Sequence, residues 1–126
     1  MHMRKITVFF EIISMDSKSR FDSDGEYKNN RIKFLDPEGD LNYVICKENS
    51  LEYYKKGNVD MKYIFDLDKV TKGYYSIQGN RFDFQIVTHI LTIDDDNMYV
   101  KYDLYQGEDL INKTELRIRY QNKEES

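Results

Sequence analysis

The alternation of apolar and polar residues between positions 72 and 105 limits most strongly what this chain can fold into. Apolar residues and threonines occupy every second position from 82 to 92, and the same period returns from 98 to 104. A period of two puts alternate side chains on opposite faces of a β-strand. Turn-forming residues interrupt the pattern at Gly79-Asn80 and at residues 95–97. The segment is therefore predicted to form three antiparallel strands joined by tight turns.

One part of this segment departs from strict alternation. A continuous period of two from position 82 places Ile90 and Thr92 on the same face as Phe82, Phe84, Ile86 and Thr88. However, Val87, Leu91 and Ile93 are apolar on the opposite face. We therefore expect either a β-bulge or burial of both faces between residues 87 and 93.

The remainder of the chain shows similar short runs separated by polar turns, and no helical pattern. Alanine is absent, whereas tyrosine and phenylalanine are plentiful, which favours strands. Residues 16–20 are expected to form a polar turn, and the Asn29-Asn30 pair a two-residue hairpin turn. Consecutive hairpins favour a meander, and closure removes its exposed edges. The prediction is an all-β, antiparallel, up-and-down barrel of about 8–10 strands.

Residues 1–126 are expected to form one domain with a frayed polar tail at 121–126. Besides the central segment, the expected strands are 4–15, 21–28, 31–35, 41–46, 51–56, 59–67 and 110–120.

Composition and charge exclude several classes of partner. The net charge of −4 comes from mixed signs along the chain, so no binding of nucleic acid or of acidic membranes is expected. Glu11 interrupts the apolar run near the start, and no apolar stretch approaches the ~20 residues of a membrane span. The single Cys46 cannot form an internal disulfide and is expected in the core. A cytoplasmic location follows as the expectation.

No catalytic or metal-binding pattern is recognisable. His89 lies mid-strand without a recognisable nucleophile, and is expected to be a structural or surface residue. The acidic run at 94–97 lacks the ligand spacing and glycine of a calcium loop, so it is interpreted as a hairpin turn. No metal, cofactor or catalytic residue is predicted. Convergence of Glu11, Asp103 and His89 in space is the alternative that the sequence leaves open.

Short motifs in a fixed order also carry a family resemblance that spans residues 6–120. They are Gly25-x-Tyr27, Asn29-Asn30, Gly57, Lys72-Gly73-Tyr74-Tyr75, Thr88, Tyr102-x-Leu104, Gly107 and Leu116-Arg117-Ile118. In this order they resemble the YwiB-like family of small uncharacterised bacterial proteins. The resemblance implies a calycin-like (lipocalin-type) β-barrel and no particular activity. The chain departs from the family by compressing residues 31–41.

Tyrosine placement suggests a binding function, with a simpler alternative. The alternation turns Tyr27, Tyr43, Tyr53 and several further tyrosines inward, and rings with a few hydroxyl groups can hold a small apolar ligand. The alternative is that these rings only fill the barrel. The residues expected to contact a ligand are Tyr63, Tyr75, Thr88, Tyr102, Thr114 and Tyr120.

A second hypothesis concerns the outer surface. Tyr54, Tyr74, Tyr99 and Tyr105 fall on outward positions, and tyrosine is enriched in protein interfaces. If they gather in one patch, the simplest partner is a second copy of the chain, giving a homodimer. An enzyme ranks below both hypotheses.

Overall fold

A computed structural model describes residues 3–123 of the chain. Ten β-strands and no helix occur within that range, which confirms the predicted all-β class. None of the described residues forms a helix that could cross a membrane. The strands are β1 (Arg4–Ile13), β2 (Lys18–Lys28), β3 (Arg31–Leu35), β4 (Leu41–Cys46), β5 (Ser50–Lys56), β6 (Val59–Asp66), β7 (Thr71–Ile77), β8 (Asn80–Ile93), β9 (Asn97–Gln106) and β10 (Asp109–Asn122).

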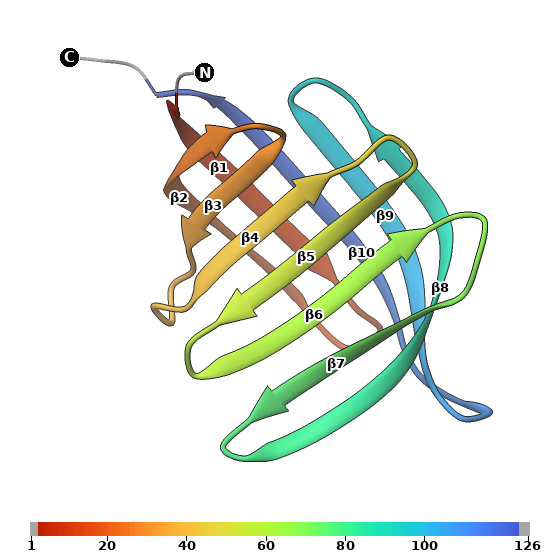
Figure 1. The fold of residues 1–126 in the computed structure, drawn as a ribbon. Coiled ribbons are helices and arrows are strands. Elements are labelled where there is room, and N and C mark those ends of the chain that lie inside the picture. The colour runs from red at the N-terminus through yellow and green to blue at the C-terminus, as the bar shows by residue number, and fades with distance from the viewer. Residues whose placement is uncertain (1–2, 124–126) are drawn as a thin grey trace.

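The strands form one closed antiparallel barrel (Figure 1). Each strand pairs with its sequence neighbours, and β1 closes the barrel by pairing with β10 from Ile6–Asn122 to Ile13–Glu115. This is the predicted up-and-down meander. The barrel has two different ends. The termini and the β2–β3, β4–β5, β6–β7 and β8–β9 connections lie at one end, here called the terminal end; the other five connections lie at the mouth end.

Local sequence chemistry explains the tight turns. Asn29 and Asn30 have φ angles of 53° and 63°, as a two-residue hairpin turn requires, and asparagine tolerates this conformation. Gln78 and Gly79 form the equivalent turn between β7 and β8. Gly25 is required by space, because a Cβ atom there would lie 2.8 Å from the carbonyl oxygen of Lys33.

The terminal half of the barrel is filled by aliphatic and aromatic side chains. Ile6 and Val8 of β1, Val100 of β9 and Ile118 of β10 are inaccessible to solvent. Tyr27 and Tyr120 stack at the terminal end with ring centroids 5.3 Å apart, and the Tyr120 hydroxyl donates to the carbonyl oxygen of Asp95. These two rings therefore cover the core at this end, and on their outer side they line a surface hollow.

A β-bulge between Thr88 and Ile90 corrects the continuous alternation predicted for β8. Beyond the bulge the faces exchange, so Ile90 is 44% exposed whereas Leu91 and Ile93 pack on the core. The expected irregularity between residues 87 and 93 is thus confirmed, but the placement of Ile90 and Thr92 on the same face as Thr88 was wrong.

Other expectations about strands need smaller corrections. β2 begins at Lys18, inside the predicted polar turn, and β7 begins at Thr71. Tyr43 points outward, because Asn42 and Val44 are the buried residues of β4. The predicted frayed tail is ordered as strand through Asn122, and residues 124–126 lie outside the described residues.

Candidate functional site

A cavity of about 500 Å³ occupies the mouth half of the barrel. Most of its walls come from inward-facing residues, and its rim comes from the β1–β2 and β3–β4 connections. The residues that line it include Phe10, Ile12, Ser14, Ser17, Ser19, Phe21, Asp36, Asp40, Tyr53, Lys55, Val59, Met61, Tyr63, Tyr75, Ile77, Tyr102, Leu104, Asn112 and Thr114.

Aromatic rings form the inner surface of this cavity. Phe10 and Phe21 stack with centroids 4.9 Å apart, and Tyr63 meets Tyr102 edge to face at 6.2 Å. Tyr102 also packs on Phe65, which is fully buried, at 4.5 Å. The rings therefore separate the cavity from the apolar core of the terminal half, and such offset and edge contacts stabilise one arrangement of the walls.

Buried polar groups shape the rim on the β3–β4 side. One oxygen of Asp36 accepts from the backbone amides of Glu38 and Asp40, and the other accepts from Asn42 Nδ2 at 3.1 Å and from Lys55 Nζ at 3.3 Å. Burial by itself would raise the pKa of Asp36, but the hydrogen bonds from Asn42 and Asp40 and the charge of Lys55 outweigh it and lower that pKa. Asp36 is thus ionised and fully engaged by the protein.

The second rim carboxylate, that of Asp40, is also engaged internally. Its oxygens accept from the backbone amides of Asn58 at 2.7 Å and Val59 at 3.1 Å, across the β5–β6 turn. Asp40 therefore ties the β3–β4 connection to the β5–β6 turn, and neither rim carboxylate presents free charge to a ligand.

Tyrosine hydroxyls supply the uncommitted polar groups of the cavity. Tyr53 donates to Asn42 Oδ1, whereas Tyr63 and Tyr75 donate to no acceptor within residues 3–123. Burial raises the pKa of Tyr63 and of Tyr102, so both hydroxyls stay protonated at neutral pH. Protonated hydroxyls in an otherwise apolar space can orient a ligand that carries one or two polar atoms.

The structure divides the six residues predicted to contact a ligand. Tyr63, Tyr75, Tyr102 and Thr114 line the cavity together. Thr88 faces inward and is buried, but it does not line the cavity, and its hydroxyl oxygen lacks a partner among the described residues. Tyr120 lies at the terminal end, where it lines a separate surface hollow with Tyr27.

Sequence reasoning missed the polar rim. Asp36 and Asp40 are the first and last residues of the proline-containing loop at 36–40. Loop residues show no alternation, so the sequence pattern does not indicate that these two are buried. Lys55 follows Leu51 and Tyr53 at the inward period of β5, so its inward position was readable from the alternation. A lysine among inward tyrosines is the signal that could have indicated a buried carboxylate partner.

Two other predicted features lie away from the cavity. His89 is on the outer surface, where its Nε2 is 2.8 Å from Oδ2 of Asp103; Glu11 belongs to a different part of the outer face. The predicted outward tyrosines all face outward, but only Tyr54 and Tyr74 share a row, with Lys62 between them, while Tyr99 and Tyr105 lie on β9. The homodimer stays a prediction.

Comparison with known proteins identifies the family. A model of the domain of unknown function DUF1934 matches residues 10–118. The chain belongs to this family. The barrel is similar to the crystal structure of the ywiB protein from Bacillus subtilis, with a TM-score of 0.69 and 14% sequence identity. That match covers 97% of this chain and 94% of the ywiB chain. A comparison with curated protein sequences returns no match.

The DUF1934 match confirms the predicted YwiB-like family, and the structural similarity confirms its barrel fold at low sequence identity. A fold hosts many functions, so function has to be argued from the cavity and the surface of this chain.

Proposed function

We propose that this DUF1934 protein is a non-enzymatic binding protein that holds a small, mostly apolar ligand in the mouth half of its barrel. The cavity carries the proposal, because its volume of about 500 Å³ falls in the range of small-molecule sites and its floor is closed by aromatic rings. We place this function in the cytoplasm. The single Cys46 supports that location, because a lone thiol needs no oxidising compartment.

The chemistry of the lining defines the ligand class. Phe10, Phe21 and Met61 offer apolar contacts, and the hydroxyls of Tyr63 and Tyr75 offer hydrogen bonds. The ligand is therefore expected to have a flat or branched apolar body and one or two polar atoms. A strongly charged ligand is disfavoured, since both rim carboxylates and Lys55 already satisfy one another or the backbone.

A neutral fluorescent probe tests the proposal. N-phenyl-1-naphthylamine is small and apolar, and its emission rises when it leaves water. We expect saturable binding at one site per chain. In Val59→Trp, a large ring at the cavity wall should weaken binding at least tenfold, about 1.4 kcal/mol.

Ser76→Trp provides the matched control. Ser76 is half-buried like Val59. However, it lies on the outward face of β7, opposite Asp60 of β6, and does not line the cavity. Binding to this variant should equal that of the wild type, and urea denaturation verifies that both variants are folded. Equal probe affinity in the two tryptophan variants, or no saturable binding to the wild type, contradicts the proposal.

A further inference from the structure

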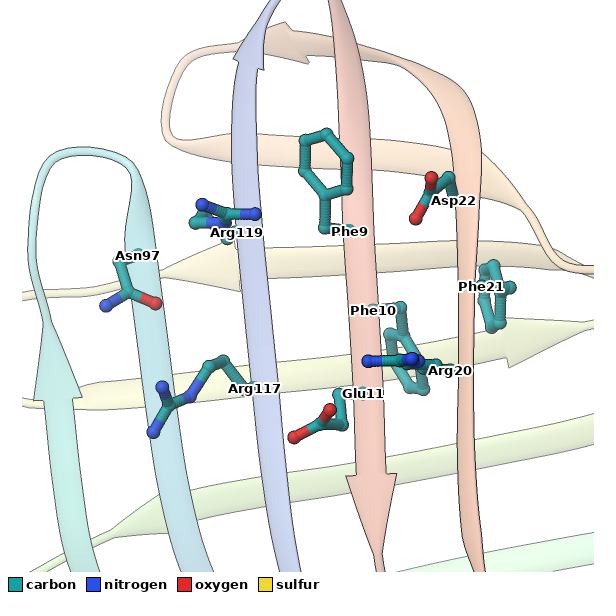
Figure 2. Close-up of a pocket in the computed structure, with 9 residues that line it drawn as sticks. All are labelled: Phe9, Phe10, Glu11, Arg20, Phe21, Asp22, Asn97, Arg117 and Arg119. Atoms are coloured by element: carbon teal, nitrogen blue, oxygen red, sulfur yellow. The ribbon is translucent and has the colours of Figure 1, made fainter.

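A second hollow, larger than the mouth cavity, lies on the outer surface of β1, β2, β9 and β10 (Figure 2). Three arginines line it: Arg20 of β2 and Arg117 and Arg119 of β10. The strand register places them close together, because Glu11 of β1 is opposite both Arg20 and Arg117, and Phe9 of β1 is opposite Arg119. The carboxylates of Glu11 and Asp22 also line the hollow, so three positive and two negative side chains leave it one net positive charge in a chain whose net charge is −4.

No carboxylate among residues 3–123 forms an ion pair within 4.0 Å with any of these three guanidinium groups. Glu11 pairs instead with Lys18 at 3.8 Å, and the nearby Glu115 accepts the hydroxyl of Tyr99. Each arginine therefore keeps several N–H donors available on an exposed surface.

Two of the guanidinium groups are held in place by aromatic rings. The Arg117 guanidinium lies over Tyr99 at 5.0 Å, and that of Arg119 lies over Phe9 at 4.8 Å. Stacking covers one flat face of a guanidinium and leaves its N–H edge free. A guanidinium whose position is already restricted loses less entropy when it binds an oxyanion.

The spacing suits a ligand with more than one oxyanion group. Arg117 and Arg119 are two positions apart on the same face, which is roughly 7 Å along a strand. Arg20 lies two strands away, roughly 10 Å across the sheet. Arginine recognises phosphate bidentately, so this triangle can contact neighbouring phosphate groups.

Hydrogen-bond acceptors also line the hollow. The side-chain oxygen of Asn97 is buried and has no hydrogen-bond partner among the described residues, and Asp22 lines the same hollow. Both can accept from N–H or O–H groups of a ligand, and the Asn97 amide nitrogen can also donate to an anion.

From these contacts we infer that the face formed by Arg20, Arg117 and Arg119 binds a phosphate-bearing ligand. Its phosphates lie against the guanidinium edges, and any organic part lies toward Asn97, which is opposite Arg119 on β9. This site opens on the outer face of the barrel wall, whereas the proposed lumen site opens at the mouth; Phe10 and Phe21 line both. Its failure would leave the lumen proposal untouched.

Isothermal titration calorimetry of the full chain tests the inference with three probes. These are inorganic tripolyphosphate, ATP and adenosine, all without magnesium. We expect tripolyphosphate and ATP to bind, adenosine not to bind, and affinity to fall as salt is raised. Equal affinities for the first two identify the phosphates as the whole ligand, whereas tighter ATP binding shows that the organic part contributes; both support the inference.

Variants assign the binding to these residues. Arg117→Gln combined with Arg119→Gln should weaken tripolyphosphate binding at least tenfold. Arg81→Gln is the matched control: Arg81 also stacks on a tyrosine, Tyr74 at 4.2 Å, but it pairs with Asp83 at 3.0 Å. Arg117→Lys retains the charge and reports on geometry if the double variant fails to fold, with a smaller loss expected. Unchanged affinity in both the double variant and Arg117→Lys, or no heat with millimolar tripolyphosphate, overturns the inference.

Discussion

Replacing Asp36 with asparagine should destabilise the barrel at its mouth. The side chain is 2% exposed, and its two oxygens accept four hydrogen bonds. In Asp36→Asn, one oxygen remains for the amides of Glu38 and Asp40, but an NH₂ group now faces Asn42 Nδ2 and Lys55 Nζ, which are also donors. One neutral and one charged hydrogen bond are lost, so the expected cost is about 3 kcal/mol.

Urea denaturation measures this cost. With an m-value of about 1–3 kcal/mol/M, the midpoint should fall by roughly 1–3 M. Glu38→Gln changes an exposed carboxylate in the same loop, and should stay within about 0.5 kcal/mol of the wild type. Asp36→Asn and Glu38→Gln with the same midpoint would show that the buried carboxylate does not organise the rim.

The stability difference between the wild type and Asp36→Asn should also depend on pH. The pKa of Asp36 is lowered from 3.8 in the folded state, so its carboxylate contributes stability above that value. This contribution is lost as the pH falls below about 4 toward the lowered pKa. The difference in unfolding free energy between wild type and Asp36→Asn should therefore be constant near neutral pH and shrink below about pH 4. A difference that grows in acid would refute the assigned direction.

Two further predictions concern backbone space and thiol reactivity. Gly57 has a φ of 151°, and a Cβ atom there would lie 2.2 Å from Asp40 Oδ1. Gly57→Ala should therefore cost about 3 kcal/mol in urea denaturation, whereas Gly39→Ala, with positive φ but open space around it, should cost about 1 kcal/mol; equal costs would contradict the role of Asp40. Burial raises the pKa of the Cys46 thiol to about 11. Its reaction with dithionitrobenzoate at pH 8 should be about a hundredfold slower in the folded protein than in urea, and equal rates would show that Cys46 is accessible.

Alternation along single strands predicts the barrel well where it is uninterrupted. In β9, Met98, Val100, Tyr102 and Leu104 all face inward as expected. Alternation fails where both faces of a strand carry apolar residues. In β4, Leu41, Tyr43 and Ile45 are apolar, so they outweigh Asn42 on any hydropathy argument, yet Asn42 is fully buried. Its partners are Asp36 and Asp40 of the preceding loop and Tyr53 of β5, and hydropathy carries no information on these hydrogen bonds.

The sequence predicted which residues of the candidate site point into the barrel, but not where along the barrel axis each of them lies. Tyr102 and Tyr120 both point inward, yet Tyr102 lies in the mouth half and Tyr120 at the terminal end. A period of two carries no information on the position of a residue along the barrel axis. Only the distance of the residue from a turn gives that position. Thr88 precedes the β8 bulge, whose position depends on pairing with β9 and is not set by residues 87–93 alone.

The two proposed sites share strand β1, and its alternation keeps them apart. Phe10 points into the mouth cavity, whereas Phe9 and Glu11 point toward the arginine face. Neither site contributes the fully buried residues of the terminal half, where Ile6 and Ile118 stabilise the barrel. Changes at one site should therefore leave the fold and the other site intact. Val59→Trp should retain tripolyphosphate affinity, and the double arginine variant should retain N-phenyl-1-naphthylamine affinity; loss of both ligands in either variant would mean that the sites are coupled through β1.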